Sequence, residues 1–96
     1  MRIEFDSVVT RWNSRVDSWF FATLPEELSL DIRELPSPPR GFGSLRVRAS
    51  IGATEWTTSI FFSGSAFVLP LKKQVRQAES IEEGDVVTVE LDILDV

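Results

Sequence analysis

The stretch SLRVRASIGATEWTTSIFF, residues 44–62, decides the fold class of this chain. In residues 45–51 every second residue is apolar, which is the period of a strand with one buried face. Gly52 and Ala53 then supply a tight turn, and residues 54–62 supply a second strand rich in β-branched and aromatic side chains. The sequence therefore predicts a β-hairpin over residues 44–62.

Outward from this hairpin, the same signals predict four more strands. On the N-terminal side, residues 3–12 and 19–24 are typical of strands, with polar turn residues over 13–18 between them. On the C-terminal side, residues 66–69 form a short strand after a Ser-Gly-Ser turn, and residues 87–93 alternate between apolar and polar side chains. Together with the hairpin, these segments make six strands.

Two short helices are predicted, each opened by a proline. Pro25 and Pro70 suit the first helical position, where a missing N–H has no partner to lose, and Pro36 is expected to end the first helix. Both units run strand, proline, helix, which reflects either an internal repeat with pseudo-twofold symmetry or one favourable junction used twice. The predicted apolar faces consist of Leu28, Ile32 and Leu35 in the first helix and Leu71, Val75 and Ala78 in the second.

These elements predict one small, mainly β domain over residues 1–96. A sheet of six strands with few helices usually closes into a barrel, because closure removes the edges that would pair with other chains. We therefore expect a closed or nearly closed six-stranded, mainly antiparallel barrel with two short helices.

Composition excludes several kinds of chemistry. The chain has no cysteine and no histidine, so disulfides, thiolate zinc sites, cysteine nucleophiles and the usual general base near neutral pH are ruled out. We expect no cofactor and no metal site. The formal net charge of −5 disfavours nucleic acid, because phosphate binding depends on lysine and arginine. No apolar run is long enough for a signal peptide or a membrane span, so we expect a soluble cytoplasmic protein.

The most suggestive candidate site is the pair Lys72 and Lys73, in the first turn of the predicted second helix. Cations at this end oppose the helix dipole, and a bound anion would relieve the conflict. The alternative is two solvated lysines on a surface turn.

Arg76 and Trp56 are the next candidates. Arg76 either clamps a ligand or has a structural role, in which it caps helix carbonyls or pairs with Asp85. Trp56, together with Phe61 and Phe62, either forms the floor of an apolar pocket or belongs to the core.

Three polar residues of the predicted hairpin complete the set. Ser59 lies within an apolar strand, and with no histidine in the chain a lysine would have to activate it as a nucleophile. Arg46 and Arg48 share one face of their strand, where they either line a barrel mouth or lie on a solvated outer face.

Four motifs follow one another in the second half of the chain. Together with Pro25 and the Arg-Gly-Phe-Gly stretch at 40–43, they resemble the bacterial domain-of-unknown-function family nineteen-oh-five, over about residues 3–94. The resemblance implies a small closed β-barrel with Greek-key connections. It also leads us to expect a basic residue and a proline where this chain has Thr57 and Phe62. The motifs are Ile51-Gly52, Trp56-Thr-Thr-Ser-Ile-Phe61, Leu69-Pro-Leu-Lys-Lys-Gln-Val-Arg-Gln-Ala78 and Ile81-Glu-Glu-Gly-Asp-Val-Val-Thr-Val89.

These observations favour a non-catalytic binding or interaction module whose ligand is a small anion or a protein partner. A shorter stretch, residues 69–89, is also similar to the AbrB-like swapped-hairpin regulators, and this similarity implies a DNA-binding dimer as one alternative. An enzyme that uses lysine and carboxylates is the other. Membranes are not expected as partners, and the oligomeric state is left open.

Overall fold

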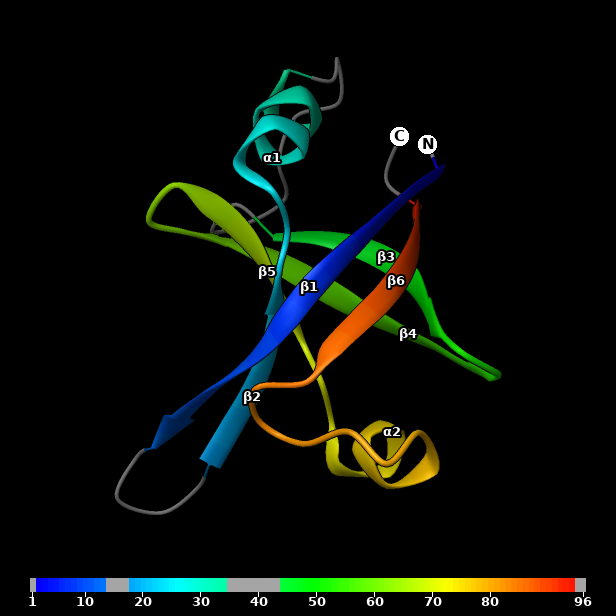
Figure 1. The fold of residues 1–96 in the computed structure, drawn as a ribbon. Helices are drawn as coiled ribbons and strands as arrows, with labels where there is room; N and C mark the ends of the chain where they lie inside the picture. The colour runs from blue at the N-terminus through cyan, green and yellow to red at the C-terminus, as the bar shows by residue number, and fades with distance from the viewer. Residues whose placement is uncertain (1, 14–17, 35–43, 95–96) are drawn as a thin grey trace.

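The part of the chain that the computed structural model describes, residues 2–13, 18–34 and 44–94, forms a closed barrel of six antiparallel strands, as the sequence predicts. Two helices accompany the barrel and lie near its opposite ends (Figure 1). The elements are β1 (Arg2–Asn13), β2 (Ser18–Thr23), α1 (Glu26–Arg33), β3 (Ser44–Ile51), β4 (Thr54–Ser63), β5 (Ala66–Pro70), α2 (Lys73–Ala78) and β6 (Val86–Ile93).

The strands follow the order β1, β2, β5, β4, β3, β6 around the ring, and β6 pairs with β1 to close it. β3, β4 and β5 are consecutive antiparallel neighbours, and β6 then lies on the other side of β3. The spatial order β6, β3, β4, β5 defines a Greek key, which is the connection type that the family resemblance implies.

The predicted hairpin over residues 44–62 is formed by β3 and β4. The two strands pair from Ser44 opposite Phe61 to Ile51 opposite Thr54. Gly52 turns the chain with φ +58°, a left-handed value that glycine adopts without steric cost.

The first helix begins one residue later than predicted, because Pro25 is the N-cap of α1 rather than its first residue. Glu26 and Glu27 lie in the first turn, where carboxylates complement the positive end of the helix. The expected apolar residue Leu35 and the expected end at Pro36 lie outside the described residues.

Pro70 does not open the second helix, which corrects the prediction. It is the last residue of β5, and α2 begins at Lys73. The backbone hydrogen bond to β2 next to Pro70 is made by Leu71, whose N–H donates to the Phe20 carbonyl at 2.8 Å. Pairing of β5 with β4 has already ended at Val68, so a proline at the strand end removes no ladder bond.

The helices cover opposite ends of the barrel because their preceding strands, β2 and β5, are antiparallel neighbours. This is the arrangement that pseudo-twofold symmetry requires. From α1, Ile32 is buried, and the buried Ser29 hydroxyl accepts a hydrogen bond of 2.9 Å from a backbone N–H of β5. From α2, Val75 is buried, but Ala78 is exposed, contrary to the prediction, and Ile81 beyond the helix is buried instead.

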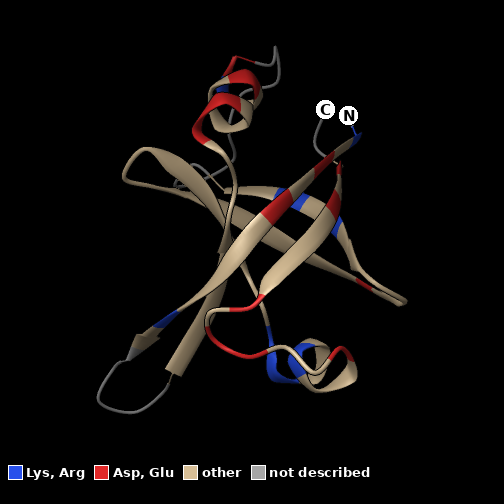
Figure 2. Ribbon diagram, in the orientation of Figure 1, with Lys and Arg blue, Asp and Glu red and all other residues tan. Residues whose placement is uncertain are grey.

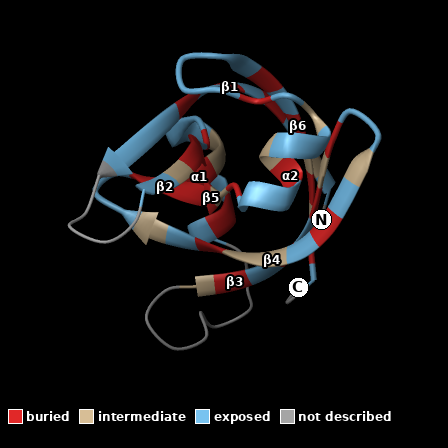
Figure 3. Ribbon diagram, turned by 90° about the horizontal axis from the view of Figure 1, so that it is seen from below, coloured by how far each residue is buried: buried red, intermediate tan, exposed pale blue. Residues whose placement is uncertain are grey.

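The inward side chains of the strands form one continuous core (Figure 3). Seven residues of this core have a relative exposure of 0%: Ala22, Val47, Ala49, Ile60, Leu69, Val89 and Leu91. Because side chains occupy the barrel interior, candidate sites are found on the surface and at the ends of the barrel.

Candidate ligand-binding groove

A groove of about 280 Å³ lies where α2 meets the barrel. Residues 18–20 at the start of β2, residues 56–58 of β4, and residues 70–73 with Arg76 line it. These segments are far apart in sequence and meet because β2 and β4 flank β5 around the ring. Of the residues singled out from the sequence as ligand-binding candidates, the groove contains Lys72, Lys73, Arg76 and Trp56.

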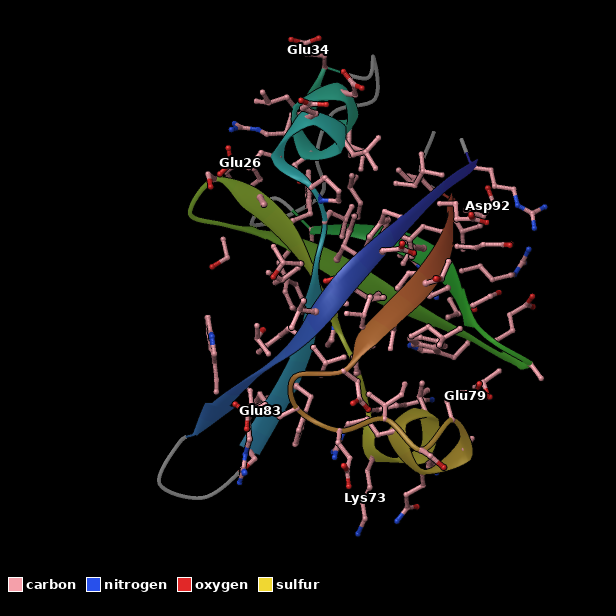
Figure 4. The ribbon with its side chains drawn as sticks, viewed as in Figure 1. Glu26, Glu34, Lys73, Glu79, Glu83 and Asp92 are labelled. Atoms are coloured by element: carbon pink, nitrogen blue, oxygen red, sulfur yellow. The ribbon has the colours of Figure 1, made fainter. Side chains whose placement is uncertain are left out.

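The two lysines contribute positive charge, but not as the matched pair that we expected. Both are exposed, and neither forms an ion pair with another described residue. Figure 4 shows the Lys73 side chain extending from α2 away from the barrel, so Lys73 belongs to the rim of the groove. Lys72 is therefore the stronger candidate for contact with a ligand.

The helix itself adds little to this charge. α2 has 6 residues, with Lys72 in an extended conformation at its N-cap, so the dipole argument made from the sequence loses most of its weight. Figure 2 shows basic residues on α2 and acidic residues in the segment that follows it. The positive character of the groove thus comes from side chains.

Arg76 has a structural role in the wall of the groove. Its Nε donates a hydrogen bond of 3.0 Å to the carbonyl of Leu71, and its Cζ lies 3.9 Å from the centre of the Phe20 ring. The alternative partner, the Asp85 carboxylate, instead accepts a hydrogen bond of 2.8 Å from the backbone N–H of Glu82. Arg76 therefore links α2 to β2 and fixes a positive charge beside an aromatic ring.

Trp56 lies between the core and the groove. It is 7% exposed and belongs to the core cluster, yet it also lines the groove. Phe61 and Phe62 do not join it there: Phe61 is 40% exposed, and Phe62 packs edge-on against Phe67 with ring centres 5.3 Å apart. Of these three rings, that of Trp56 is the one that lines the groove.

Ser59 does not line the groove, although it was a candidate. It pairs with Arg46 in the β3–β4 ladder, and Arg46 is exposed on the outer face of β3. Thr57 and Thr58, its neighbours on β4, line the groove instead. Sequence reasoning did not single out these threonines as ligand-binding candidates, because their place in the groove depends on how β2 and α2 lie beside β4.

Trp19 was also missed. It lines the groove from β2 and is 53% exposed. Its aromatic type was visible in the sequence, but its place beside α2 depends on the order of strands around the ring.

A smaller cleft of about 90 Å³ on the outer face of the barrel is lined by two arginines and three carboxylates. Arg2 donates a hydrogen bond of 2.9 Å to Glu90, and this bond together with the positive charge of Arg2 lowers the pKa of the Glu90 carboxyl. Arg48 lies 3.7 Å from Glu55 and 3.9 Å from Asp92. Arg48 thus belongs to a network of exposed ion pairs, as the outer-face interpretation predicts.

Among the described residues there is no group of three or more His, Cys, Asp or Glu side chains that could hold a metal ion. Neither described helix has the length and hydrophobicity of a membrane span. The family model with the description "Domain of unknown function (DUF1905)" matches residues 5–91, nearly the whole chain. No curated protein matches the chain.

Proposed function

This chain belongs to the DUF1905 family, and we propose that it is a non-catalytic binding module that holds a small anionic ligand in the groove beside α2. One observation carries the proposal: Lys72 and Arg76 line the groove together with three aromatic rings, those of Trp19, Phe20 and Trp56. The chain that carries this positive site has a formal net charge of −5. A local positive site on an acidic protein attracts anions while the remaining surface repels them.

The chemistry of the lining residues supports binding rather than catalysis. The described lining residues supply cations, hydroxyls and aromatic rings, and include no carboxylate. Cations and hydroxyls can orient an anion, whereas acid–base catalysis needs a group that exchanges a proton near neutral pH. An aromatic wall with a few polar groups is the usual composition of a small-molecule site.

Nucleic acid fits this surface less well than a small anion. The basic residues of the groove are confined to residues 72–76, and Glu79, Glu82, Glu83 and Asp85 follow them closely (Figure 2). A phosphate backbone would extend past the cations onto this acidic segment and be repelled. We include a bacterial, cytoplasmic setting in the proposal, supported by the family resemblance and by a cysteine-free chain that needs no oxidising compartment.

Thermal unfolding against a panel of small carboxylates, phosphates and nucleotides tests the proposal. A ligand at about 100 times its dissociation constant adds roughly 2.7 kcal/mol of stability, which raises Tm by about 10–20 °C in a domain of this size. We expect one class of anion to give such a shift in the wild type and a much smaller one in Lys72→Ala.

Arg46→Ala is the control, because it also removes one positive charge, but from an exposed residue on the outer face of β3 that does not line the groove. It should retain most of the shift. The proposal fails if no anion in the panel stabilises the protein, or if Lys72→Ala responds as the wild type does.

A further inference from the structure

Trp19 is a large apolar side chain on the open wall of the groove. It is 53% exposed, so about half of its surface gains nothing from burial in the absence of a ligand. Its cross-strand neighbour Trp12 has a similar exposure, 57%, but packs edge-on against Phe21 with ring centres 5.0 Å apart. Trp12 is not one of the residues that line the groove. Two similar tryptophans on one hairpin therefore differ in whether they adjoin the site.

The basic residues and the aromatic residues that line the groove are in contact with each other. The guanidinium of Arg76 lies 3.9 Å from the centre of the Phe20 ring, and Phe20 follows Trp19 in β2. Lys72 lines the groove together with Arg76 and has no ion pair among the described residues. A molecule that fills the groove thus meets flat apolar surface and positive charge together.

The size of the groove limits what can fill it. Its volume of about 280 Å³ lies just below the range of roughly 300–1,000 Å³ that is typical of sites for drug-sized ligands. One or two fused rings with an acidic group fit this space, whereas a peptide or a nucleic-acid strand would extend beyond it. Thr57 and Thr58 add hydroxyls that can bond polar atoms on the edge of a ring.

We propose that the ligand is an aromatic acid, meaning one or two fused aromatic rings that carry a carboxylate or phosphate group. This inference rests on the proposed function and specifies its ligand class. The ring stacks against Trp19, and the acidic group is held by Lys72 with the positive charge of Arg76 nearby. An aromatic ring without an acidic group would not bind Lys72, and an anion without a ring would not stack on Trp19.

Isothermal titration calorimetry with two probes tests this class and separates its two sources. Indole-3-acetate represents aromatic carboxylates, and adenosine 5′-monophosphate represents aromatic phosphates. Indole supplies the ring alone, and acetate and inorganic phosphate supply the anion alone. We expect at least one aromatic acid to bind about tenfold or more tightly than both of its parts, because stacking and charge act on the same molecule.

Paired variants locate the two contacts. Trp19→Leu and Lys72→Ala should each weaken binding of that acid about tenfold. Trp12→Leu and Arg46→Ala, at residues that do not line the groove, should stay within about twofold of the wild type. In ¹H–¹⁵N spectra, the indole N–H signal of Trp19 should move on titration while that of Trp12 stays in place. The spectra also show whether each variant is folded.

Two contrary results are distinguishable. If aromatic acids bind no more tightly than acetate or phosphate and Trp19→Leu has no effect, while Lys72→Ala still abolishes anion binding, the ligand class is wrong and the anion site stands. If neither simple anions nor aromatic acids bind in a manner that depends on Lys72, both the ligand class and the proposed function are wrong.

Discussion

At the scale of single residues, Ser29 shows how one hydroxyl attaches a helix to the barrel. It is fully buried in α1, and its Oγ accepts the backbone N–H of Phe67 at 2.9 Å. A buried N–H without a partner is costly, and the Phe67 N–H has no partner in the strand ladder. Because Ser29 accepts this N–H, the bond holds α1 against β5. The sequence gives little hint of this role, because serine in a helix is usually solvated.

Replacing Ser29 with alanine should lower the free energy of unfolding by about 1–3 kcal/mol, because the Phe67 N–H would be left buried and unpaired. Urea denaturation monitored by tryptophan emission measures this change. Ser65→Ala is the matched control: Ser65 donates to Glu26 at 2.8 Å in an exposed position, and its loss should cost less than about 0.5 kcal/mol. Equal effects of the two changes would show that the buried bond is not what fixes α1.

The candidate site was partly predictable at this scale. Lys72, Arg76 and Trp56 were chosen from residue type and position, and all three line one groove. Ser59, the remaining candidate, does not line the groove, because the part of β4 that borders the groove ends at Thr58. Trp19 was missed because its place in the groove depends on the order of the strands around the ring.

At the scale of elements, the β3–β4 hairpin depends on its turn. Gly52 has φ +58°, and a Cβ there would overlap the carboxylate of Glu79. The same carboxylate accepts a hydrogen bond of 2.6 Å from the hydroxyl of Thr54. The turn is therefore fixed both by the backbone conformation and by the segment that follows α2.

Gly52→Ala should destabilise the protein by about 2–3 kcal/mol, about 1–2 from the left-handed conformation and about 1 from displacing Glu79. Gly64→Ala separates the two costs, because Gly64 has φ +69° but open space around it, so only the first cost of about 1–2 kcal/mol applies. Thermal or urea unfolding of both variants gives the difference. If Gly64→Ala costs as much as Gly52→Ala, the contact with Glu79 is unimportant.

The elements that the sequence predicted well are those with a strict period. Alternation in residues 45–51 and 87–93 predicted two strands that the structure contains. Pro70 misled the prediction because proline is tolerated at the end of a strand as readily as at the start of a helix, provided that no ladder bond is lost. The local sequence contains no information about whether β4 still pairs at that point.

At the scale of the whole molecule, the barrel is closed by the pairing of its first strand with its last. β1 and β6 pair from Arg2 opposite Asp92 to Val8 opposite Val86. On the outer face of this seam, Arg2 and Glu90 form an exposed ion pair of 2.9 Å.

The stability of this seam should depend on pH. Because the Arg2 hydrogen bond and charge lower the pKa of Glu90 in the folded state, the pair stabilises the protein above the ordinary carboxyl pKa of about 4.3, and this contribution is lost as the pH falls through the lower folded-state pKa. Arg2→Met should therefore have a lower Tm than the wild type at pH 7, with the difference vanishing in strong acid. NMR titration should show the Glu90 pKa rising in the variant.

Salt provides the control for that experiment. Both side chains are exposed, so raising the salt concentration to about 1 M should screen the pair and reduce the difference at pH 7. A difference in Tm that persists unchanged in acid and in high salt would mean that Arg2 acts through packing of its aliphatic stem and not through its charge.

The closure of the ring also governs how the chain acquires its structure during synthesis. Among the six strands of the barrel, β1 is made first, but the strand that covers one of its edges, β6, is made last, with Arg2 pairing opposite Asp92. Bringing such distant segments together costs loop-closure entropy before the contacts repay it, and folding is slow when contacts are distant in sequence. The nascent chain must therefore remain open along β1 until its final strand emerges, so the barrel completes itself after translation of residue 93 and not progressively from its N-terminus.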